Sequence, residues 1–437
     1  MRRGSNAGGY RNATVDAGTT KRPGRTGLFY LADRFQIAIK DELQWRVNRS
    51  FYSRCSFNEM PDYLYLVFWV FIFAVIVQCA YALYFFVRIL PRNETPNLSE
   101  SEARPISIII CARNEAQALR KNLPQILYQK YRGQHGDGLF EVIVVDDSSS
   151  DETPLILTEF AKQNGHLKVI AITPSEKAEH VGKKFALRQA VAASKHEWLL
   201  FTDADCCPAS DEWLSMMAAP MASGKEIVMG YGGYYARAGF LNKFIRFETM
   251  HTFLQFSTYA MAGRPYMGVG RNLACKKDAW LRAAETKAWK TLASGDDDLM
   301  VSAIGTKNNT AVVFDPASFT YSGAKVTWGD WRKQKQRHLS TGKYYKWDIK
   351  MLLGIYAVSH AVLWLCVIVL LFSPHFESVL LIVAGRCIIY WLLWVATAQK
   401  LKEKNMVYLF PVFDIAWMMY NFAFLPYIAW KNKQQWK

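Results

Sequence analysis

The chain has 437 residues, of which 51% are hydrophobic and 14% aromatic, and this length allows one or two domains. The formal net charge is +16, but this charge does not indicate a nucleic-acid-binding protein. Much of the basic excess lies next to long apolar segments, where anionic lipid headgroups are the simpler partner. Eight cysteines are scattered without a CxxC spacing, which argues against a zinc site and favours reduced thiols.

Residues 1–60 are basic, are rich in Gly, Ser, Thr and Asn in their first half, and show no cleavable signal peptide. We expect a disordered extension here, unless translation begins at Met60, and N-terminal sequencing of the native protein distinguishes these hypotheses. The next segment, 61–90, has no charge between Asp62 and Arg88. About 25 apolar residues are enough for a helix to cross a bilayer, so this segment is predicted to be a transmembrane helix.

Three more apolar segments lie within residues 351–437, and each is about long enough to cross a bilayer. The second contains Arg386 and the third contains Asp414. Charges are costly in lipid unless they are paired or hydrated, so we expect these two to pair, although they could instead line a lipid or glycan path. The three predicted transmembrane segments are 351–372, 379–398 and 406–430.

The charges beside these segments predict their orientation. Lys and Arg are abundant just before residue 351 and in the loop 399–405, and they are absent from the loop 373–378. Positively charged loops remain in the cytoplasm, so the first two regions should be cytoplasmic and the third external. The chain is therefore predicted to be a multi-pass membrane protein with residues 91–350 in the cytoplasm.

The central region alternates apolar runs with helical patterns, which is typical of an α/β sheet with crossover helices. In such sheets, ligands bind beyond the carboxyl ends of the strands. Glu115, Asp147, Asp203 and Asp205 all follow predicted strand ends. The predicted strands are 105–111, 140–145, 167–172 and 198–201, and the predicted helices are 116–129, 185–193 and an amphipathic helix at 240–262.

Asp203 and Asp205 form a DxD pair directly after an apolar strand. Side chains at positions i and i+2 of an extended backbone point the same way. Two carboxylates can then hold Mg²⁺ or Mn²⁺ while the remaining coordination positions stay open for phosphate oxygens. This pair therefore indicates a nucleotide diphosphate site.

Two further clusters each have two interpretations. Lys183 and Lys184 begin a helix, either as a solvated basic end or as a source of a lysine for a uracil or phosphate group, for which Lys184 is preferred. Asp296, Asp297 and Asp298 form either an acidic helix start, which the helix dipole favours, or part of a catalytic site. Three adjacent carboxylates repel one another, so one of them is expected to titrate unusually high.

Seven motifs occur in a recognisable order over about residues 105–347: ARNEA, VVDDSSSDET, GKKFAL, TDADC, YMGVGRNLACKK, SGDDDL and QKQRH. This series resembles the membrane-bound, inverting family 2 glycosyltransferases, the superfamily of ceramide glucosyltransferase and the cellulose, chitin and hyaluronan synthases. The resemblance implies a GT-A catalytic domain, an α/β Rossmann-like nucleotide-diphospho-sugar transferase fold, at 91–325. This domain would be inserted between transmembrane helices, with an interfacial segment at 326–350.

The resemblance also implies roles for residues at the donor site. Glu115 and Asp147 would lie near the base and ribose of a nucleotide sugar, usually UDP-linked. Asp203 would lie near the ribose and diphosphate, and Asp205 would bind the metal. Asp296 aligns best with the family's catalytic aspartate, the base that takes the acceptor's proton. Asp297 is the alternative base, Gly295 stands where the family usually has Glu, and Lys184 is counted with the donor site.

Further roles concern the acceptor side. Gly268, Gly270 and Asn272 belong to a motif, residues 266–277, that resembles the loop and strand shaping the acceptor site. Gln334 and Arg337 match the family's QxxRW motif, in which Gln and Arg lie near the acceptor or the diphosphate. His338 replaces the usual Trp and is counted as acceptor-binding. The alternative for this segment is a basic interfacial helix that binds lipid headgroups.

The resemblance implies transfer of a sugar, with inversion, from a nucleotide sugar to a membrane-associated acceptor, with Mg²⁺ or Mn²⁺ as cofactor. One N-terminal and three C-terminal spans are closer to the ceramide glucosyltransferase arrangement than to the larger synthases, which favours a lipid acceptor. A processive polysaccharide synthase is the alternative, since a homo-oligomer or an accessory subunit could complete a channel. A non-enzymatic membrane scaffold has no need of metal-binding carboxylates ordered along strand ends.

Overall fold

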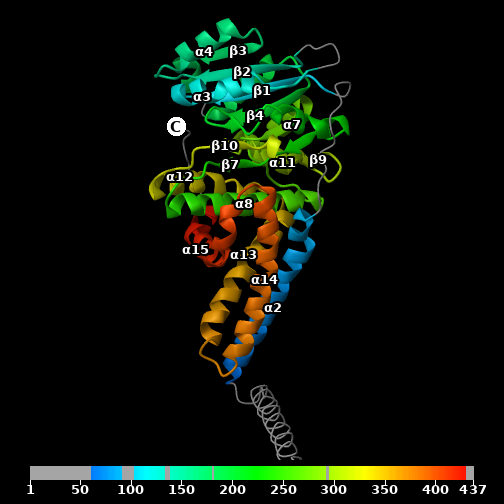
Figure 1. The fold of residues 1–437 in the computed structure, drawn as a ribbon, viewed down its shortest axis with the longest axis vertical. Coiled ribbons are helices and arrows are strands. Elements are labelled where there is room, and N and C mark those ends of the chain that lie inside the picture. The colour runs from blue at the N-terminus through cyan, green and yellow to red at the C-terminus, as the bar shows by residue number, and fades with distance from the viewer. Residues whose placement is uncertain (1–60, 91–102, 133–137, 180–181, 292–294, 430–437) are drawn as a thin grey trace, which may run out of the picture. The chain divides into compact units, whose positions relative to one another are not determined.

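The region between the first and second apolar segments, which is predicted to be cytoplasmic, has a seven-stranded sheet at its core. The strand order is β3-β2-β1-β4-β8-β6-β9 (Figure 1). The computed structural model describes residues 61–90, 103–132, 138–179, 182–291 and 295–429. The expectations for residues 1–60 and for a start at Met60 lie outside these residues. The strands β1 to β4 are parallel, β8 is antiparallel to both β4 and β6, and β9 is parallel to β6. Their bounds are β1 Ile106–Ala112, β2 Phe140–Asp147, β3 Leu167–Ile172, β4 Trp198–Asp203, β6 Ile227–Met229, β8 Leu273–Lys276 and β9 Thr310–Val312.

The parallel strands β1, β2 and β4 are apolar because helices cover both faces of this part of the sheet. Ile108 and Val144 face one hydrophobic cluster, and Ile109 and Val145 face the other. A strand buried on both faces reads as a continuous apolar run, and this made β1, β2 and β4 predictable, whereas the edge strand β3 is partly exposed. The helices of this domain are α3 Ala116–Leu127, α4 Thr153–Gln163, α5 Pro174–Glu179, α6 Lys183–Ala193, α7 Trp213–Ala222, α9 Lys277–Ala284, α10 Lys287–Thr291 and α11 Asp298–Ile304.

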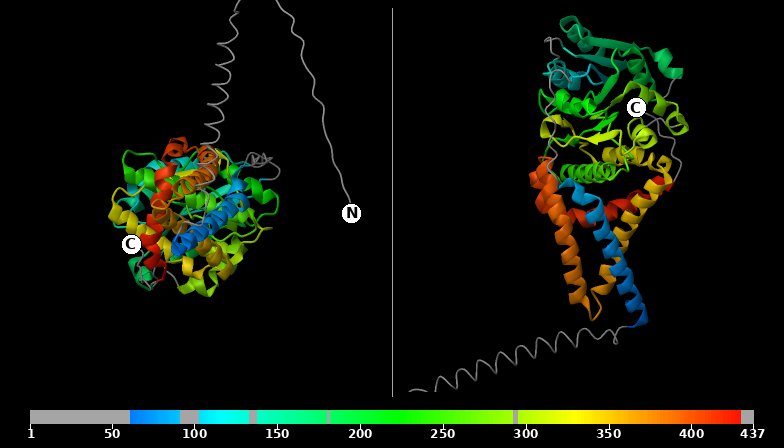
Figure 2. Two further views of the ribbon diagram at one scale, coloured as in Figure 1. Left: turned by 90° about the horizontal axis from the view of Figure 1, so that it is seen from below. Right: turned by 90° about the vertical axis from the view of Figure 1, so that its right-hand side faces the viewer.

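A second, three-stranded sheet lies between the large sheet and helix α8 (Figures 1 and 2). It consists of β5 Cys207–Pro208, β10 Thr320–Ser322 and β7 Gly232–Tyr234, in that order. The sequence did not predict these strands, or β6 and β9, and only the family resemblance of residues 266–277 implied a strand where β8 lies. Each has only two to four residues, which is too short for a hydrophobic period to stand out.

Helix α8, Phe240–Met261, lies under the small sheet and above the apolar helices (Figure 2). Sixteen of its 22 residues are buried, so the prediction that this helix is amphipathic is wrong. The reason is that the small sheet covers one side while the apolar helices cover another. The four phenylalanines serve packing, as expected, and Phe244, Phe247, Phe253 and Phe256 are all buried.

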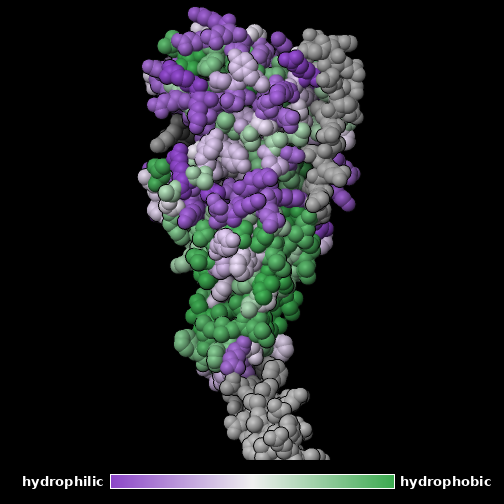
Figure 3. Space-filling model, viewed as in Figure 1, coloured by the Kyte–Doolittle hydropathy of each residue, from purple (hydrophilic) through white to green (hydrophobic). Residues whose placement is uncertain are grey.

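Four helical segments are long and apolar enough to cross a membrane. They form the hydrophobic band below the hydrophilic α/β domain in Figure 3. The candidate spans are Asp62–Ile89, Trp347–Leu370, Phe376–Lys400 and Lys404–Phe424, close to the predicted segments. They comprise α2 Asp62–Tyr84, η2 Phe86–Ile89, α13 Trp347–Leu370, α14 Phe376–Lys400, η5 Lys404–Leu409 and α15 Phe410–Ala429.

The predicted pairing of the two charges within these spans is confirmed. Arg386 of α14 forms an ion pair with Asp414 of α15, and its Nη2 donates to Gln78 Oε1 of α2 at 3.0 Å. Trp364 Nε1 of α13 donates to Asp414 Oδ2 at 3.2 Å, and His360 Nε2 lies 3.2 Å from Asp414 Oδ1. One buried polar network therefore joins all four candidate spans.

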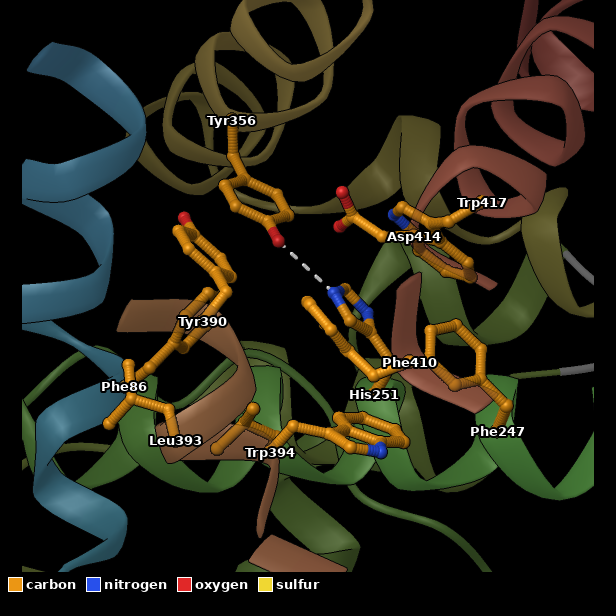
Figure 4. A pocket seen from close by; sticks show the side chains of 11 residues that line it. Phe86, Phe247, His251, Tyr356, Tyr390, Leu393, Trp394, Phe410, Asp414 and Trp417 are labelled. Atoms are coloured by element: carbon orange, nitrogen blue, oxygen red, sulfur yellow. Dashed lines mark hydrogen bonds between the residues drawn. The ribbon is translucent and has the colours of Figure 1, made fainter. Parts of the chain in front are cut away.

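Helix α8 of the α/β domain contacts these spans through His251 (Figure 4). His251 Nε2 lies 3.1 Å from the Tyr356 hydroxyl of α13, and its ring lies 4.3 Å from that of Trp417 on α15. Arg246 of α8 also forms a buried ion pair with Glu403, in the turn between α14 and η5. The α/β domain is thus fastened to the apolar helices by polar contacts as well as by packing.

A double-mutant cycle on Arg386→Met and Asp414→Leu tests the buried pair. Each single substitution leaves a buried charge without its partner, so each should lower the free energy of unfolding by about 3–5 kcal/mol. The double variant should lose less than the sum of the two, because neither charge is then left alone. Unfolding in detergent measures all three, with Glu377→Gln at the exposed start of α14 as control. Additive losses would contradict the coupling.

Candidate active site

The loops that follow β1 and β2 are bound together by hydrogen bonds. The Asn114 amide donates to Ser149 Oγ at 2.9 Å, the Ser150 amide donates to Asn114 Oδ1 at 2.8 Å, and the Glu115 amide donates to Thr153 Oγ1 at 2.9 Å. The sheet brings these loops together because β1 and β2 are parallel neighbours in register. The ARNEA and DDSSSDET motifs therefore form one wall of the site.

Within this wall, some acidic residues have only local roles. Asp146 Oδ1 accepts a hydrogen bond from the Ser149 amide, and Asp151 accepts from the amides of Ala116 and Thr153. Asp147 is buried at the carboxyl end of β2. Glu115 is partly buried. Burial, followed by the negative charges of Asp205 and Asp203, raises the pKa of Glu115 to about 7, so this carboxyl lies within the electrostatic range of the DxD pair.

Strand β4 ends at Asp203, whose backbone is in register with Cys111 of β1. Lys183 at the start of α6 donates from Nζ to Asp203 Oδ1 at 2.5 Å. The same Nζ lies 4.0 Å from Asp296 Oδ2. Although burial alone would raise it, Lys183, and then Arg271 and Arg337, hold the pKa of Asp203 below its usual value. Asp203 is therefore ionised, and its negative charge is partly offset by the ammonium group of Lys183.

The DxD pair has the donor set for a divalent cation. Asp205 is exposed, and ligand atoms of Asp203, Asp205 and Cys206 lie within 4.8 Å of one another. Among the residues that the structure describes, the one hydrogen bond of the Asp205 carboxylate is a weak one at 3.5 Å from Cys206 Sγ to Oδ1. Carboxylate oxygens are the ligands that Mg²⁺ and Mn²⁺ prefer. These residues fit such an ion, with Asp205 the more accessible ligand.

The structure favours Lys183 over Lys184 as the lysine of this site. Lys184 Nζ donates to the Trp289 carbonyl at 2.5 Å and lies 4.5 Å from the centre of the Trp289 ring. Burial lowers the pKa of Lys184 to about 8. Successive residues of a helix point about 100° apart, so one lysine faces the DxD pair while its neighbour faces α10.

The three adjacent aspartates are in different environments. Asp297 Oδ2 accepts from the Gly270 amide at 2.7 Å, and its Oδ1 accepts from the Asp298 amide at 2.8 Å, as the N-cap of α11. Asp298 Oδ2 accepts from Thr341 Oγ1 at 2.5 Å and from the Tyr345 hydroxyl at 2.9 Å. The acidic helix start is therefore real. Asp296 is the aspartate whose carboxylate faces Lys183, with 18% of its side chain exposed.

Gly295 has a positive φ of 81°, a conformation that residues with a Cβ rarely adopt. A Cβ there would lie 2.8 Å from Thr341 Cγ2 and 2.9 Å from Asp298 Oδ1. The tight packing around the Asp298–Thr341 contact thus explains why this chain has Gly at a position where Glu is usual in the resembling family.

Helix α12, Trp328–Leu339, carries the QKQRH motif. Gln334 and Arg337 are both partly buried, and they lie three residues apart, on one face of the helix. The charge of Arg337 acts on Asp203, as noted above, whereas His338 is exposed. Trp331 on the same helix packs against Tyr420 and Phe424 of α15, so α12 joins the site to the apolar helices.

The loop before β8 is less available to an acceptor than the sequence suggested. Asn272 is fully buried: its Nδ2 donates to the carbonyls of Tyr231 and Ser318, and its Oδ1 accepts from Trp213 Nε1. We therefore do not retain Asn272 as an acceptor-binding residue. Gly268 and Gly270 allow close packing, and a Cβ on Gly270 would lie 3.3 Å from Asp297 Oδ2.

Glu248 and His251 of α8 also have structural partners. Glu248 forms an ion pair with Lys335 of α12, and His251 contacts Tyr356. Sequence reasoning ranked Lys183 below Lys184 and did not single out Arg271, whose charge acts on Asp203. Both lie inside motifs that were recognised, but motif order alone does not say which side chain points into the site.

Two family models match this chain. Glycosyl transferase family 2 matches residues 107–268, and glycosyl transferase family group 2 matches residues 198–424, more than half of the 437 residues. The chain belongs to the family 2 glycosyltransferases. The resemblance seen in the seven motifs is thereby confirmed.

Similar proteins support the same assignment. The β-monoglucosyldiacylglycerol synthase of Trichormus variabilis is 34% identical over 112 residues, which are 26% of this chain and 22% of that protein. Human dolichyl-phosphate β-glucosyltransferase is 32% identical over 124 residues, which are 28% of this chain and 37% of that protein. The chain therefore spans well under two thirds of the length of these relatives.

A solved structure supports the GT-A fold. The mannosyltransferase PcManGT from Pyrobaculum calidifontis, in complex with GDP-Man and Mn²⁺, superposes with a TM-score of 0.50 at 15% identity. The match covers 82% of this chain and 99% of that one. With the mixed sheet and its crossover helices, this confirms the predicted fold class.

The protonation of Asp297 predicts a pH dependence of stability. Burial, followed by the charges of Asp296 and Asp298, raises the pKa of Asp297 from 3.8 to about 7. Between pH 3.8 and about 7, the folded chain holds this proton while the unfolded chain releases it. The free energy of unfolding should therefore fall as pH rises through this range. Glu115 contributes in the same direction, since its pKa is also about 7.

Asp297→Asn should flatten this decline, as measured by unfolding in detergent at a series of pH values. Glu285→Gln, at an exposed carboxylate paired with Lys290, should leave the slope between these values almost unchanged. An unaltered slope in Asp297→Asn would mean that this carboxyl is ionised throughout the window.

Proposed function

We propose that the chain transfers a sugar, with inversion, from a nucleotide sugar, most simply a UDP-sugar, to an acceptor in the membrane. The observation that carries this proposal is the geometry around Lys183. Its Nζ bridges Asp203 of the DxD pair and Asp296, while the carboxylates of Asp297 and Asp298 are occupied by hydrogen bonds. An acidic group close to the donor end of the sheet is where an inverting transferase needs its base.

Asp205, together with Asp203, would hold Mg²⁺ or Mn²⁺. Such an ion supplies charge stabilisation for the departing diphosphate. Lys183 keeps Asp203 ionised and fixes its orientation through the contact at Oδ1. Glu115 and Asp147 lie at the adjacent strand ends, which supports their assignment to the base and ribose of the donor.

In the proposed reaction, Asp296 accepts the proton of the acceptor hydroxyl as that oxygen attacks the anomeric carbon. The new glycosidic bond forms on one face of the sugar as the bond to the phosphate oxygen breaks on the other. The nucleoside diphosphate leaves with the bonding electrons, and the configuration is inverted. Arg337 and Gln334 on α12 are assigned to the diphosphate or the acceptor, and His338 to the acceptor side.

A lipid acceptor is favoured by the position of α12. This helix packs on α15 through Trp331, so one short helix both carries a proposed site residue and contacts a candidate membrane span. The names of two relatives also include lipids, diacylglycerol and dolichyl phosphate. We propose that the α/β domain is cytoplasmic, because the basic segments lie at that end of the candidate spans.

Processive synthesis of a polysaccharide is the second candidate. Sugar polymerisation uses the same donor chemistry, but four candidate spans leave little room for a glycan channel unless a second copy or an accessory subunit completes it.

The first experiment supplies the purified chain in detergent with Mg²⁺ or Mn²⁺, a panel of radiolabelled nucleotide sugars and extracted membrane lipid. Label should enter a single lipid band. Asp296→Asn should lower turnover about 10²- to 10⁴-fold because the base is lost. Asp205→Ala should abolish the stimulation of turnover by Mg²⁺ or Mn²⁺ because a metal ligand is lost. Asp211→Asn, at an exposed carboxylate paired with Lys130, is the control. Label in high-mass material would support the polysaccharide alternative, and full turnover in Asp296→Asn would exclude it as the base.

Lys183→Met and Lys184→Met form a matched pair. Lys183→Met removes the cation between two carboxylates, so turnover should fall at least tenfold and the loss should persist at saturating donor. Lys184→Met removes a contact with the Trp289 carbonyl, so it should lower the melting temperature while the folded enzyme retains most of its turnover. The reverse order of losses would assign the site to Lys184.

A further inference from the structure

Arg271 lies next to the DxD pair, in the loop between Gly270 and β8. Its backbone is held in place from both sheets. The Arg271 carbonyl accepts from Thr202 Oγ1 at 3.0 Å and from Thr320 Oγ1 at 3.1 Å. Thr202 is in β4, immediately before Asp203, and Thr320 is in β10 of the small sheet. The position of Arg271 relative to the DxD pair is therefore fixed by the fold.

The side chain of Arg271 is also oriented by the small sheet. The guanidinium carbon lies 4.4 Å from the centre of the Tyr234 ring, and Nη1 donates to Ser322 Oγ at 3.3 Å. Gly232 leaves space for it, because a Cβ there would lie 3.2 Å from Nε. The Tyr234 ring, the Ser322 hydroxyl and the space left by Gly232 thus fix the orientation of the guanidinium, a planar group that has five N–H donors.

Among the described residues, no carboxylate lies within ion-pair distance of Arg271, although the charges of Asp203 and Asp205 act on it. Asp203 is instead paired with Lys183. A partly buried cation without a paired carboxylate costs free energy unless an anion binds it. A guanidinium oriented in advance is suited to phosphate, because its planar donors match two phosphate oxygens.

We propose that Arg271 is a phosphate-binding residue, which holds a phosphate group beside the metal-binding carboxylates. The proposal rests on the proposed function, in which a phosphate-bearing substrate enters this site. Two sources supply the same chemistry: the diphosphate of the nucleotide sugar and the phosphate of a polyprenyl-phosphate acceptor. The proximity of Arg271 to Asp203 and Asp205 favours the diphosphate, because the metal and the guanidinium would then share its charge.

The test measures binding to the full chain, without turnover. The probes are uridine, UDP and GDP, each with Mn²⁺ and with EDTA, and vesicles that contain a polyprenyl phosphate or neutral diacylglycerol. Arg271→Met should weaken binding of the nucleoside diphosphate about tenfold or more, with and without Mn²⁺, and leave uridine binding unchanged. Arg271→Lys keeps the positive charge but loses the planar pair of N–H donors, so its affinity for the nucleoside diphosphate should lie between those of Arg271→Met and the unaltered chain.

Arg264→Met is the matched control, since Arg264 is an exposed arginine of the preceding loop that pairs with Asp348. It should bind every probe as the unaltered chain does. Ser322→Ala removes only the hydroxyl that positions Nη1, so it should weaken diphosphate binding by a smaller factor, and it provides a second test if Arg271→Met does not fold.

The outcomes separate the proposals. Unchanged affinity for the nucleoside diphosphate, with weaker binding only to polyprenyl-phosphate vesicles, assigns the phosphate to the acceptor. Unchanged binding of both would overturn the phosphate role and leave Arg271 as a packing residue. If the unaltered chain bound no nucleoside diphosphate at all, the proposed donor would be wrong, and the vesicle measurement would still decide whether Arg271 recognises phosphate.

Discussion

The contact between the Lys183 ammonium and the carboxylates of Asp203 and Asp296 is the interaction on which the site depends. Three strand ends and one helix start bring negative groups to the same edge of the sheet, and like charges at close range oppose folding. Lys183 lies 2.5 Å from Asp203 Oδ1 and 4.0 Å from Asp296 Oδ2, so one cation offsets two anions. Because helix α6 begins with this lysine, formation of the sheet and helix also sets the position of the proposed base relative to the donor site.

Hydrogen bonds divide three chemically identical side chains into different roles. Asp297 caps α11 and holds the Gly270 amide, and Asp298 holds Thr341 and Tyr345. These two aspartates connect the acidic segment to the loop before β8 and to the segment that enters α13. Asp296 is left facing Lys183. A cluster of carboxylates can thus be both an acidic helix start and a catalytic candidate, since its members do not share the same environment.

Polar contacts join the α/β domain to the apolar helices. His251 meets Tyr356 (Figure 4) and Arg246 pairs with Glu403, while Glu248 pairs with Lys335 of α12, the helix that packs on α15 through Trp331. Arg246, Glu248 and His251 all belong to α8, which is consistent with the burial of this helix on nearly all sides. Polar contacts in a buried layer fix orientation more strictly than packing alone, because each one requires a particular partner geometry. The proposed acceptor side is therefore held in a defined position relative to the candidate spans.

The amino-acid sequence by itself determined the four central strands, the four candidate spans, the Arg386–Asp414 pair and the family, because long apolar runs and ordered motifs are local properties of the chain. It did not determine the short strands of the small sheet, the burial of α8, or the directions of individual side chains. Lys183 and Lys184 are adjacent and identical in type, and only the packing of α6 against the sheet turns one toward Asp203 and the other toward Trp289. Asn272 belongs to a recognised motif, yet its amide is used by three interior partners. Such choices were decided by the tertiary structure, since they depend on contacts between residues that lie far apart in the sequence.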